Sequence, residues 1–122
     1  MIGVDIIEIP RIARAAADGK LIARHFTPRE IKYFKSKNMS PASIAGNWAA
    51  KEALAKALGT GVRGFSLIDV EILRHTLGQP FILCKGKRLR ASVSISHSKD
   101  NAVAVVSLPW HGRLQAKMIL KI

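Results

Sequence analysis

An acidic residue interrupts an apolar run near the start of the chain. Asp5 lies within residues 2–7, whose sequence IGVDII is otherwise apolar and largely β-branched. Burial of a carboxylate is costly unless the group is paired or binds a cation. Asp5 therefore indicates a cation site, a structural salt bridge with one of the many basic residues, or the exposed end of a strand.

A second group of charged residues lies in the middle of the chain, within a run of alanines. Glu52 and Lys56 are four residues apart, as are Asn47 and Lys51, so each pair shares a face of a predicted helix. The simpler interpretation is an ion pair on a solvated stripe. The functional interpretation assigns Glu52 to a metal ion and the two lysines to phosphate oxygens, which lysine binds as a point charge.

Two glycines follow this helix directly, in the sequence Gly59-Thr60-Gly61. Glycine lets a backbone turn sharply and approach a ligand closely. Glycine also ends many helices as a simple C-cap, and by itself the sequence favours that interpretation.

Serines, a histidine and a lysine follow one another in residues 94–99 (SISHSK), at the end of a predicted strand. Hydroxyl, imidazole and ammonium groups suit phosphate recognition, and His97 is also suited to proton transfer. The alternative is a polar turn between two strands. No spacing of cysteine and histidine indicates a zinc site.

The elements that would position these residues change in kind halfway along the chain. The longest predicted helix, 43–58, is apolar nearly all round and should be largely buried. Thr27 and Glu30 have the spacing of a helix N-cap, and the turn at 76–79 predicts a hairpin. We expect helices at 10–17, from Thr27 onward and at 43–58, and strands at 2–7, 65–73, 80–84, 91–96 and 102–108.

Helices followed by mostly antiparallel strands indicate an α+β fold. The 122 residues suffice for one domain, which we expect to span 1–122. In the tail, 109–122, apolar residues alternate with polar ones, and this pattern predicts an added C-terminal strand.

The chain is strongly basic, since 20 Lys and Arg residues oppose 8 Asp and Glu residues for a formal charge of +12. Such a surface attracts nucleic acid, acidic proteins, phosphates or anionic lipid. Cys84 is the single cysteine, so no internal disulfide forms. The apolar start has neither a basic leader nor a cleavage site, and no apolar stretch reaches the ~20 residues that cross a bilayer. We therefore expect a cytoplasmic protein with no membrane partner.

Five segments, taken in order, carry a resemblance to one family. They read GVDIIEIPRI (3–12), NWAAKEALAKALGTG (47–61), LIDVEIL (67–73), GQP (78–80) and SVSISHSKDNAVAVVS (92–107). Over roughly residues 2–108 the chain resembles holo-acyl-carrier-protein synthase of the small bacterial type. The middle and last segments together are quite specific to that family.

The resemblance implies a reaction and an assembly. Members transfer the 4′-phosphopantetheine arm of coenzyme A to a serine of an apo acyl carrier protein, and adenosine 3′,5′-bisphosphate leaves. Their fold is an antiparallel core with packed helices, and three chains form a trimer with active sites at the subunit interfaces. The implied partners are coenzyme A, an acidic acyl carrier protein and further copies of this chain.

The resemblance also implies roles for single residues. Mg²⁺, or alternatively Mn²⁺, would be held by Asp5 and Glu52 and would contact the pyrophosphate. The implied catalytic residues are Glu52, Lys56 and His97, with Glu52 or a metal-bound water as the leading base and His97 second. The implied coenzyme A ligands are Asn47, Lys51, Lys56, Gly59, Thr60, Gly61, Pro80, Ser96, His97 and Ser98.

Docking of the carrier protein is expected at the first helices. Arg11, Arg14 and Arg24 match the region that meets the carrier helix in the family, and opposite charges there would speed the encounter. Phe26 or Leu21 would accept an apolar contact.

One position departs from the family, which commonly has an arginine where this chain has Asn47. Loss of a bidentate guanidinium contact suggests, as one alternative, a relative that binds carrier protein without catalysis. The other alternative is a nucleic-acid-binding module, motivated by the charge. Because aromatic residues make up only 6% of the chain and no nucleic-acid motif is present, we expect no nucleic-acid partner.

Overall fold

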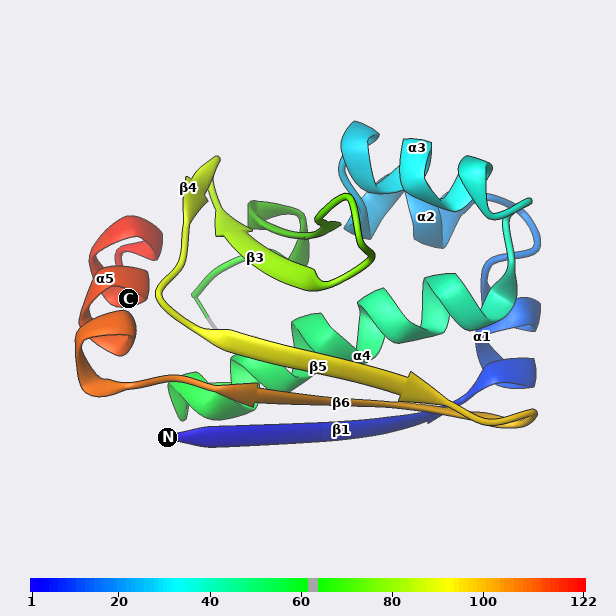
Figure 1. Cartoon of the computed structure of the whole chain (residues 1–122). Coiled ribbons are helices and arrows are strands. Elements are labelled where there is room, and N and C mark those ends of the chain that lie inside the picture. Colours follow the sequence, from blue (N-terminus) through cyan, green and yellow to red (C-terminus); the bar gives the residue numbers. More distant parts are fainter. Residues whose placement is uncertain (62–63) are drawn as a thin grey trace.

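The longest helix, α4 (Pro41–Leu58), lies between two small antiparallel sheets (Figure 1). The computed structural model describes residues 1–61 and 64–122. The other helices are α1 (Ile9–Ala15), α2 (Lys20–His25), α3 (Pro28–Ser36), the short 3-10 helix η1 (Leu67–Asp69) and α5 (Trp110–Leu120). The strands are β1 (Ile2–Glu8), β2 (Val70–Arg74), β3 (Pro80–Cys84), β4 (Lys87–Arg88), β5 (Ser92–His97) and β6 (Asn101–Ser107).

The first sheet covers α4 closely because small residues separate the two. Its strands pair antiparallel in the order β1-β6-β5. A Cβ atom on Gly3 would lie 1.9 Å from the carbonyl oxygen of Ala53, so only glycine fits at that point of β1. The predicted burial of the helix is confirmed, and Gly59 ends it as a C-cap with φ of 80°.

The outer face of the same sheet is apolar and faces away from α4. Ile2, Val4 and Ile6 are 73%, 52% and 67% exposed, respectively. The prediction of a buried strand at 2–7 is therefore wrong in part. β1 is an edge strand, and only its alternate residues turn toward the helix.

The second sheet consists of β2, β3 and β4 in that order. The predicted hairpin is confirmed, since β2 and β3 pair antiparallel and Arg74 is opposite Pro80. The predicted strand at 65–73 is wrong in its first half, because β2 begins only at Val70. The residues before it form η1, where the side chain of Asp69 accepts a hydrogen bond from the backbone N–H of Ser66.

Helices α1, α2 and α3 gather at one end of the molecule (Figure 1). The predicted cap of α3 is confirmed, since the hydroxyl of Thr27 accepts from the backbone N–H of Glu30 and the Glu30 carboxylate accepts from the backbone N–H of Thr27. Ile12, Phe26 and Phe34 form the core between these helices and α4.

The tail forms a helix, α5, at the opposite end, so the predicted strand at 109–122 is wrong (Figure 1). The tail also contains a helical spacing, in addition to the alternating one. Gly112, Ala116 and Leu120 are each four residues apart, and all three are buried. A Cβ atom on Gly112 would lie 1.9 Å from the carbonyl oxygen of Arg90, so this face packs closely on the β4–β5 connection. Tertiary packing of the four-residue repeat therefore selects the helix.

The α+β class with antiparallel sheets and packed helices is confirmed. Within residues 1–61 and 64–122, no helix combines the length and the apolar character that a bilayer span requires.

Candidate active site

A hollow of about 300 Å³ opens between β1, α1 and α4. Asp5 lines it from β1, Glu52 and Trp48 from α4, Arg11 from α1 and Leu21 from α2. Asp5 reaches the hollow because it shares the helix-facing side of β1 with Gly3. The structure thus brings together two carboxylates that lie far apart in the sequence.

Lys56 lies beside these carboxylates. Its Nζ is 3.1 Å from Oδ1 of Asp5 and donates a hydrogen bond to the carbonyl oxygen of Val4 at 3.0 Å. The lysine side chain is 54% exposed, whereas that of Asp5 is 16% exposed. The salt bridge that forms therefore joins α4 to β1, and the ammonium group remains open to solvent.

The electrostatics of the hollow favour a bound cation. Burial, and then the negative charge of Asp5, raise the pKa of Glu52 above its usual value, while Lys56 opposes the shift. Two neighbouring carboxylates repel each other, and a cation relieves that repulsion. Among the residues that the structure describes, no group of three or more His, Cys, Asp or Glu side chains gathers. Mg²⁺ commonly takes one or two carboxylates, so Asp5 and Glu52 fit it.

Pro80 and His97 lie in a second hollow of about 190 Å³. Ser43, Gly46 and Arg74 also line it, and none of the residues that the structure describes lines both hollows. Within one chain, therefore, His97 and the pair of carboxylates belong to different surfaces.

The residues around His97 form the turn between β5 and β6. The backbone N–H of Ser98 donates to the carbonyl oxygen of Asn101 at 2.8 Å, and its hydroxyl accepts from the N–H of Asn101 at 3.3 Å. Ser96 is exposed, and its place in β5 puts it on the sheet face opposite to that of His97. The polar turn considered as an alternative is thus present, and the imidazole lies at its edge.

The glycine segment after α4 is likewise a backbone turn. Gly59 and Gly61 have φ of 80° and 60°, in the left-handed region that favours glycine. The hydroxyl of Thr60 donates to the carbonyl oxygen of Gly61 at 3.0 Å.

Two predicted coenzyme A ligands lie in the interior and must be corrected. Lys51 is fully buried, and its Nζ contacts Oε1 of Glu30 at 2.6 Å and the carbonyl oxygens of His25 and Leu67. Asn47 is also fully buried. With their polar atoms already bonded inside the protein, neither side chain has a surface to offer to a phosphate.

A buried polar cluster, which the sequence did not reveal, surrounds these two residues. The carboxylate of Glu30 accepts hydrogen bonds from the side chain of Asn47 and the backbone N–H of Ile72, and Asn47 accepts one from Arg74 at 2.9 Å. Burial raises the pKa of Glu30 and lowers that of Lys51, and their mutual attraction opposes both shifts. Only the capping pattern pointed to Glu30, and no pattern pointed to Arg74.

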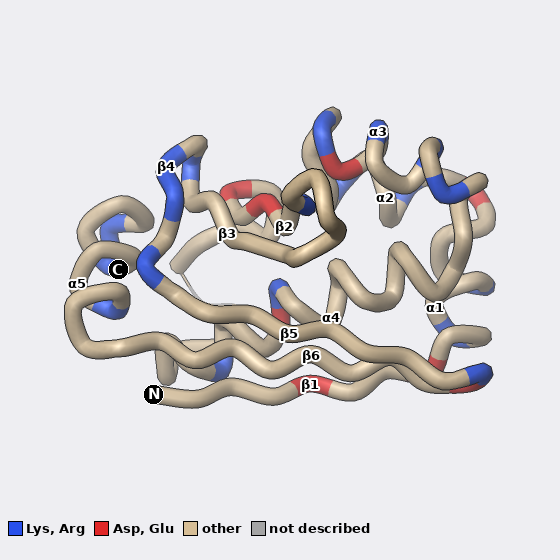
Figure 2. The backbone as a smooth tube through the Cα atoms, viewed as in Figure 1, with Lys and Arg blue, Asp and Glu red and all other residues tan. Residues whose placement is uncertain are grey.

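The residues predicted to dock the carrier protein divide into two groups. Arg11 and Arg14 of α1 and Arg24 of α2 are exposed. Phe26 is only 1% exposed and packs edge-on against Phe34, so its predicted contact with a partner is wrong. Lys and Arg positions lie on α1 and α3 at one end of the molecule and on β4 and α5 at the other (Figure 2).

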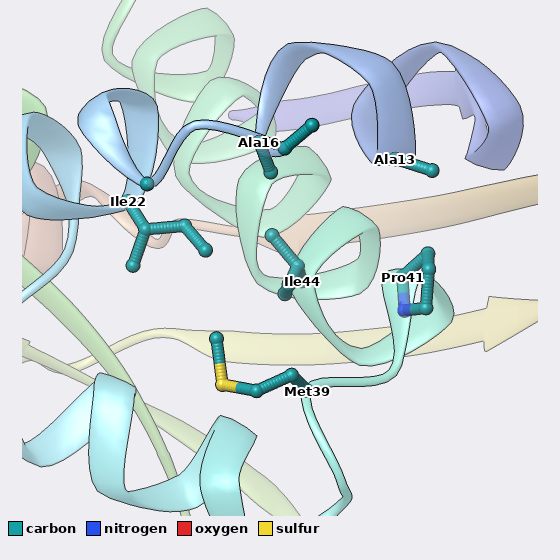
Figure 3. Close-up of a pocket in the computed structure, with 8 residues that line it drawn as sticks. Ala13, Ala16, Ile22, Met39, Pro41 and Ile44 are labelled. Atoms are coloured by element: carbon teal, nitrogen blue, oxygen red, sulfur yellow. The ribbon is translucent and has the colours of Figure 1, made fainter.

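An apolar hollow of about 380 Å³ is lined in part by α1, the helix that carries the exposed Arg11 and Arg14 (Figure 3). It is formed where α1, α2 and the start of α4 meet, by Ala13, Ala16, Ile22, Met39, Pro41 and Ile44. The region predicted to dock a carrier protein therefore combines positive charge with an apolar surface.

The motifs that build these hollows also match a family model. The model of the 4′-phosphopantetheinyl transferase superfamily matches residues 1–107. This chain belongs to that superfamily. The match of the phosphopantetheinyl transferase model ends just before α5 begins.

Named phosphopantetheinyl transferases are close to the chain in sequence. It is 51% identical over 112 residues to the holo-[acyl-carrier-protein] synthase of Clostridium beijerinckii, with 84% of this chain and 91% of that one covered. It is 48% identical over 117 residues to that of Clostridium perfringens, with 84% and 88% covered.

Solved structures of phosphopantetheinyl transferases share the fold. The Helicobacter pylori holo-[acyl-carrier-protein] synthase in complex with coenzyme A matches with a TM-score of 0.76 and 35% identity, covering 87% of this chain and 97% of that one. The Bacillus anthracis synthase in complex with CoA (3′,5′-ADP) matches with a TM-score of 0.75 and 37% identity, covering 86% and 91%.

Proposed function

We propose that this chain is a phosphopantetheinyl transferase that moves the 4′-phosphopantetheine group of coenzyme A onto a serine of an apo acyl carrier protein. The observation that carries this proposal is the hollow that holds Asp5 and Glu52 beside Lys56. Its residues come from the same motifs that place the chain in the superfamily. The relatives named holo-[acyl-carrier-protein] synthase support the choice of substrate.

In the proposed site, Asp5 and Glu52 hold Mg²⁺ through their carboxylate oxygens, with Mn²⁺ as an alternative. When bound, the ion neutralises negative charge on the phosphate oxygens of coenzyme A, as phosphoryl transfer requires. The ammonium group of Lys56, which is half exposed beside Asp5, supplies further positive charge to the same oxygens.

The reaction exchanges one P–O bond for another. The hydroxyl oxygen of the carrier serine attacks the phosphorus that bears the pantetheine arm, and the bond from this phosphorus to adenosine 3′,5′-bisphosphate breaks. Glu52, whose carboxylate lines the hollow, is the leading candidate to accept the proton of the serine. His97 is the second candidate.

We propose further that three chains assemble with the active sites at their interfaces. The separation of His97 from Asp5 and Glu52 within one chain supports this, because a neighbouring copy can bring the two hollows together. The exposed apolar face of the first sheet, with Ile2, Val4 and Ile6, offers an area for such packing. Light scattering should give the mass of a trimer, and a monomer would contradict shared sites.

We propose that the carrier protein docks on α1 and α2, which carry the exposed Arg11, Arg14 and Arg24 and also contribute residues to the apolar hollow. Attraction between these arginines and an acidic carrier steers the encounter. The hollow with Asp5 and Glu52 opens along the same helix, since Arg11 lines it.

Mass spectrometry of an apo acyl carrier protein tests the function directly. After incubation with this protein, coenzyme A and Mg²⁺, the carrier should gain the mass of one phosphopantetheine group, and EDTA should prevent the gain. Failure with several carrier proteins, with the protein folded and trimeric, would reject transfer. Binding of DNA or RNA that persists in EDTA would then favour the nucleic-acid alternative.

A further inference from the structure

Arg74, the last residue of β2, is held in a single orientation at the edge of the second hollow. Its Nη2 donates to Oδ1 of Asn47 at 2.9 Å. Its guanidinium carbon lies 4.5 Å from the centre of the Tyr33 ring, in cation–π geometry. The guanidinium is therefore fixed from two sides before any ligand arrives.

The guanidinium of Arg74 feels the charge of one carboxylate, that of Glu30, but does not contact it directly. Among the residues that the structure describes, it forms no salt bridge, and its Nη1 is buried without a hydrogen-bond partner. Burial also lowers the pKa of Arg74, as expected for a cation removed from water. Glu30 and Tyr33 oppose that shift, but the Glu30 carboxylate is already bonded to Lys51, Asn47 and Ile72. An anion bound directly beside the guanidinium would therefore further offset the cost of removing its charge from water.

The second hollow offers the surroundings that a phosphate needs. Arg74, His97 and Ser43 line it, and none of its lining residues within 1–61 and 64–122 is acidic. Gly46 and Gly78 line it as well, and the lack of side chains there leaves room for a bulky group.

We propose that Arg74 binds a phosphate group of coenzyme A in the second hollow, together with His97. This inference rests on the proposed function for the identity of the ligand, whereas the affinity of the hollow for phosphate rests on the geometry alone. Asn47 then serves as a positioning residue, since its amide oxygen holds the guanidinium. The family commonly has an arginine where this chain has Asn47. In this chain, Arg74 of β2 would supply the guanidinium instead.

Calorimetric titration of the protein in EDTA, which excludes a metal contribution, tests the assignment. The probes are coenzyme A, dephospho-coenzyme A and adenosine 3′,5′-bisphosphate. Replacement of the guanidinium in Arg74→Gln removes charge-assisted hydrogen bonds, and we expect the Kd for coenzyme A to rise by about 10- to 100-fold. Arg74→Lys keeps the charge but not the paired donors of the guanidinium, so its Kd for coenzyme A should lie between those of the wild type and Arg74→Gln.

A matched control is Lys32→Gln, which removes one positive charge from an exposed position on the neighbouring helix α3. Its Kd should stay within about twofold of that of the wild type, because a solvated charge contributes little. Thermal melting of each variant establishes that it is folded. A folded Arg74→Gln variant with an unchanged Kd for all three probes would overturn the proposal.

The three probes identify which phosphate is bound. If Arg74→Gln weakens coenzyme A but not dephospho-coenzyme A, Arg74 binds the 3′-phosphate. Equal weakening of both assigns it to the pyrophosphate. Transfer to a carrier protein is assayed separately, so a chain that transfers without any effect of Arg74→Gln on binding would refute this inference alone. If the wild-type chain shows no transfer but Arg74→Gln weakens its binding of coenzyme A, this inference is upheld and the proposed function is rejected.

Discussion

Two adjacent residues of α4, Lys51 and Glu52, enter opposite environments. Lys51 turns into the interior, where it meets Glu30 and two backbone carbonyl oxygens. Glu52 turns toward the hollow on the other side, which it shares with Asp5. Both are charged residues of one motif, yet Lys51 is bonded to polar groups of the protein itself, whereas Glu52 remains available to a ligand.

The comparison teaches that charge and motif membership do not by themselves make a ligand. In the interior, every polar atom of the Glu30–Lys51 pair has a partner within the chain, as burial demands. In the hollow, burial and the charge of Asp5 raise the pKa of Glu52, and Lys56 only opposes the shift. Repulsion between neighbouring carboxylates, which Lys56 relieves only in part, makes the hollow the environment that can accept a cation.

The largest expected effect comes from Lys51→Met, which leaves the carboxylate of Glu30 buried without its cation. Breaking a buried ion pair in this way typically costs about 3–5 kcal/mol. We expect a loss of that size in the free energy of unfolding, measured by denaturation in urea.

The double variant Glu30→Gln with Lys51→Met separates this cost from the loss of packing. Because it removes both charges, it should recover part of the stability that the single variant loses. If Lys51→Met were as stable as the wild type but failed to bind coenzyme A, Lys51 would be a ligand and the comparison would fail.

On the open side, Glu52→Gln should lower the rate of phosphopantetheine transfer by about a hundredfold or more, because a proposed ligand of the catalytic metal is lost. Stability should change by less than about 0.5 kcal/mol, since the group forms no buried pair. The rate is measured by mass spectrometry of the holo carrier protein. Glu8→Gln, at the exposed end of β1, is the matched control and should transfer normally. Normal turnover in Glu52→Gln would remove the metal assignment.

A smaller effect is expected from Arg14→Glu on α1, which reverses an exposed charge in the proposed docking region. The KM for the acyl carrier protein should rise by about tenfold, while the Kd for coenzyme A stays unchanged. Lys87→Glu changes the net charge equally at the other end of the molecule, on β4, and should leave both values alone. An equal response to both variants would show that only net charge matters.

The smallest effect concerns Glu71 of β2, whose carboxylate accepts a hydrogen bond from the hydroxyl of Thr27 and forms a salt bridge with Arg29. Burial alone would raise the pKa of Glu71, but the hydrogen bonds from Arg29 and Thr27 outweigh it and lower the pKa. A carboxylate whose pKa is lower in the folded state stabilises the fold at pH values above its ordinary pKa of about 4.5. This contribution is lost as the pH falls through the pKa of the folded state.

The difference in unfolding free energy between the wild type and Glu71→Gln should therefore be larger at pH 7 than near pH 3. Denaturation in urea at both values measures it. A difference that is the same at both would show that the carboxylate's charge contributes nothing.

Much of the fold was predictable because local signals agreed with the tertiary structure. The cap at Thr27, the C-cap at Gly59 and the hairpin before Pro80 each depend on residues close together in the chain. The tail was mispredicted because its residues satisfy two spacings at once. Only packing of Gly112 against the β4–β5 connection selects the helix.

The candidate site was predictable to a lesser degree. Asp5 and Glu52 stood out as acids in apolar runs, and the structure brings them together. The interior positions of Lys51, Asn47 and Phe26 were not foreseen. An amphipathic helix reveals its buried side through its polar face, but α4 is apolar nearly all round and offers no such reference.

The sequence by itself determined the superfamily, the order of most elements and the residue types available for a metal and for phosphates. The tertiary structure decided which of those side chains are free to act. That decision depends on the rotation of α4 between two sheets, which is set by close approaches such as that of Gly3 to Ala53. Because these contacts join residues far apart in the chain, no local pattern records them, and the structure alone separates Glu52 from Lys51.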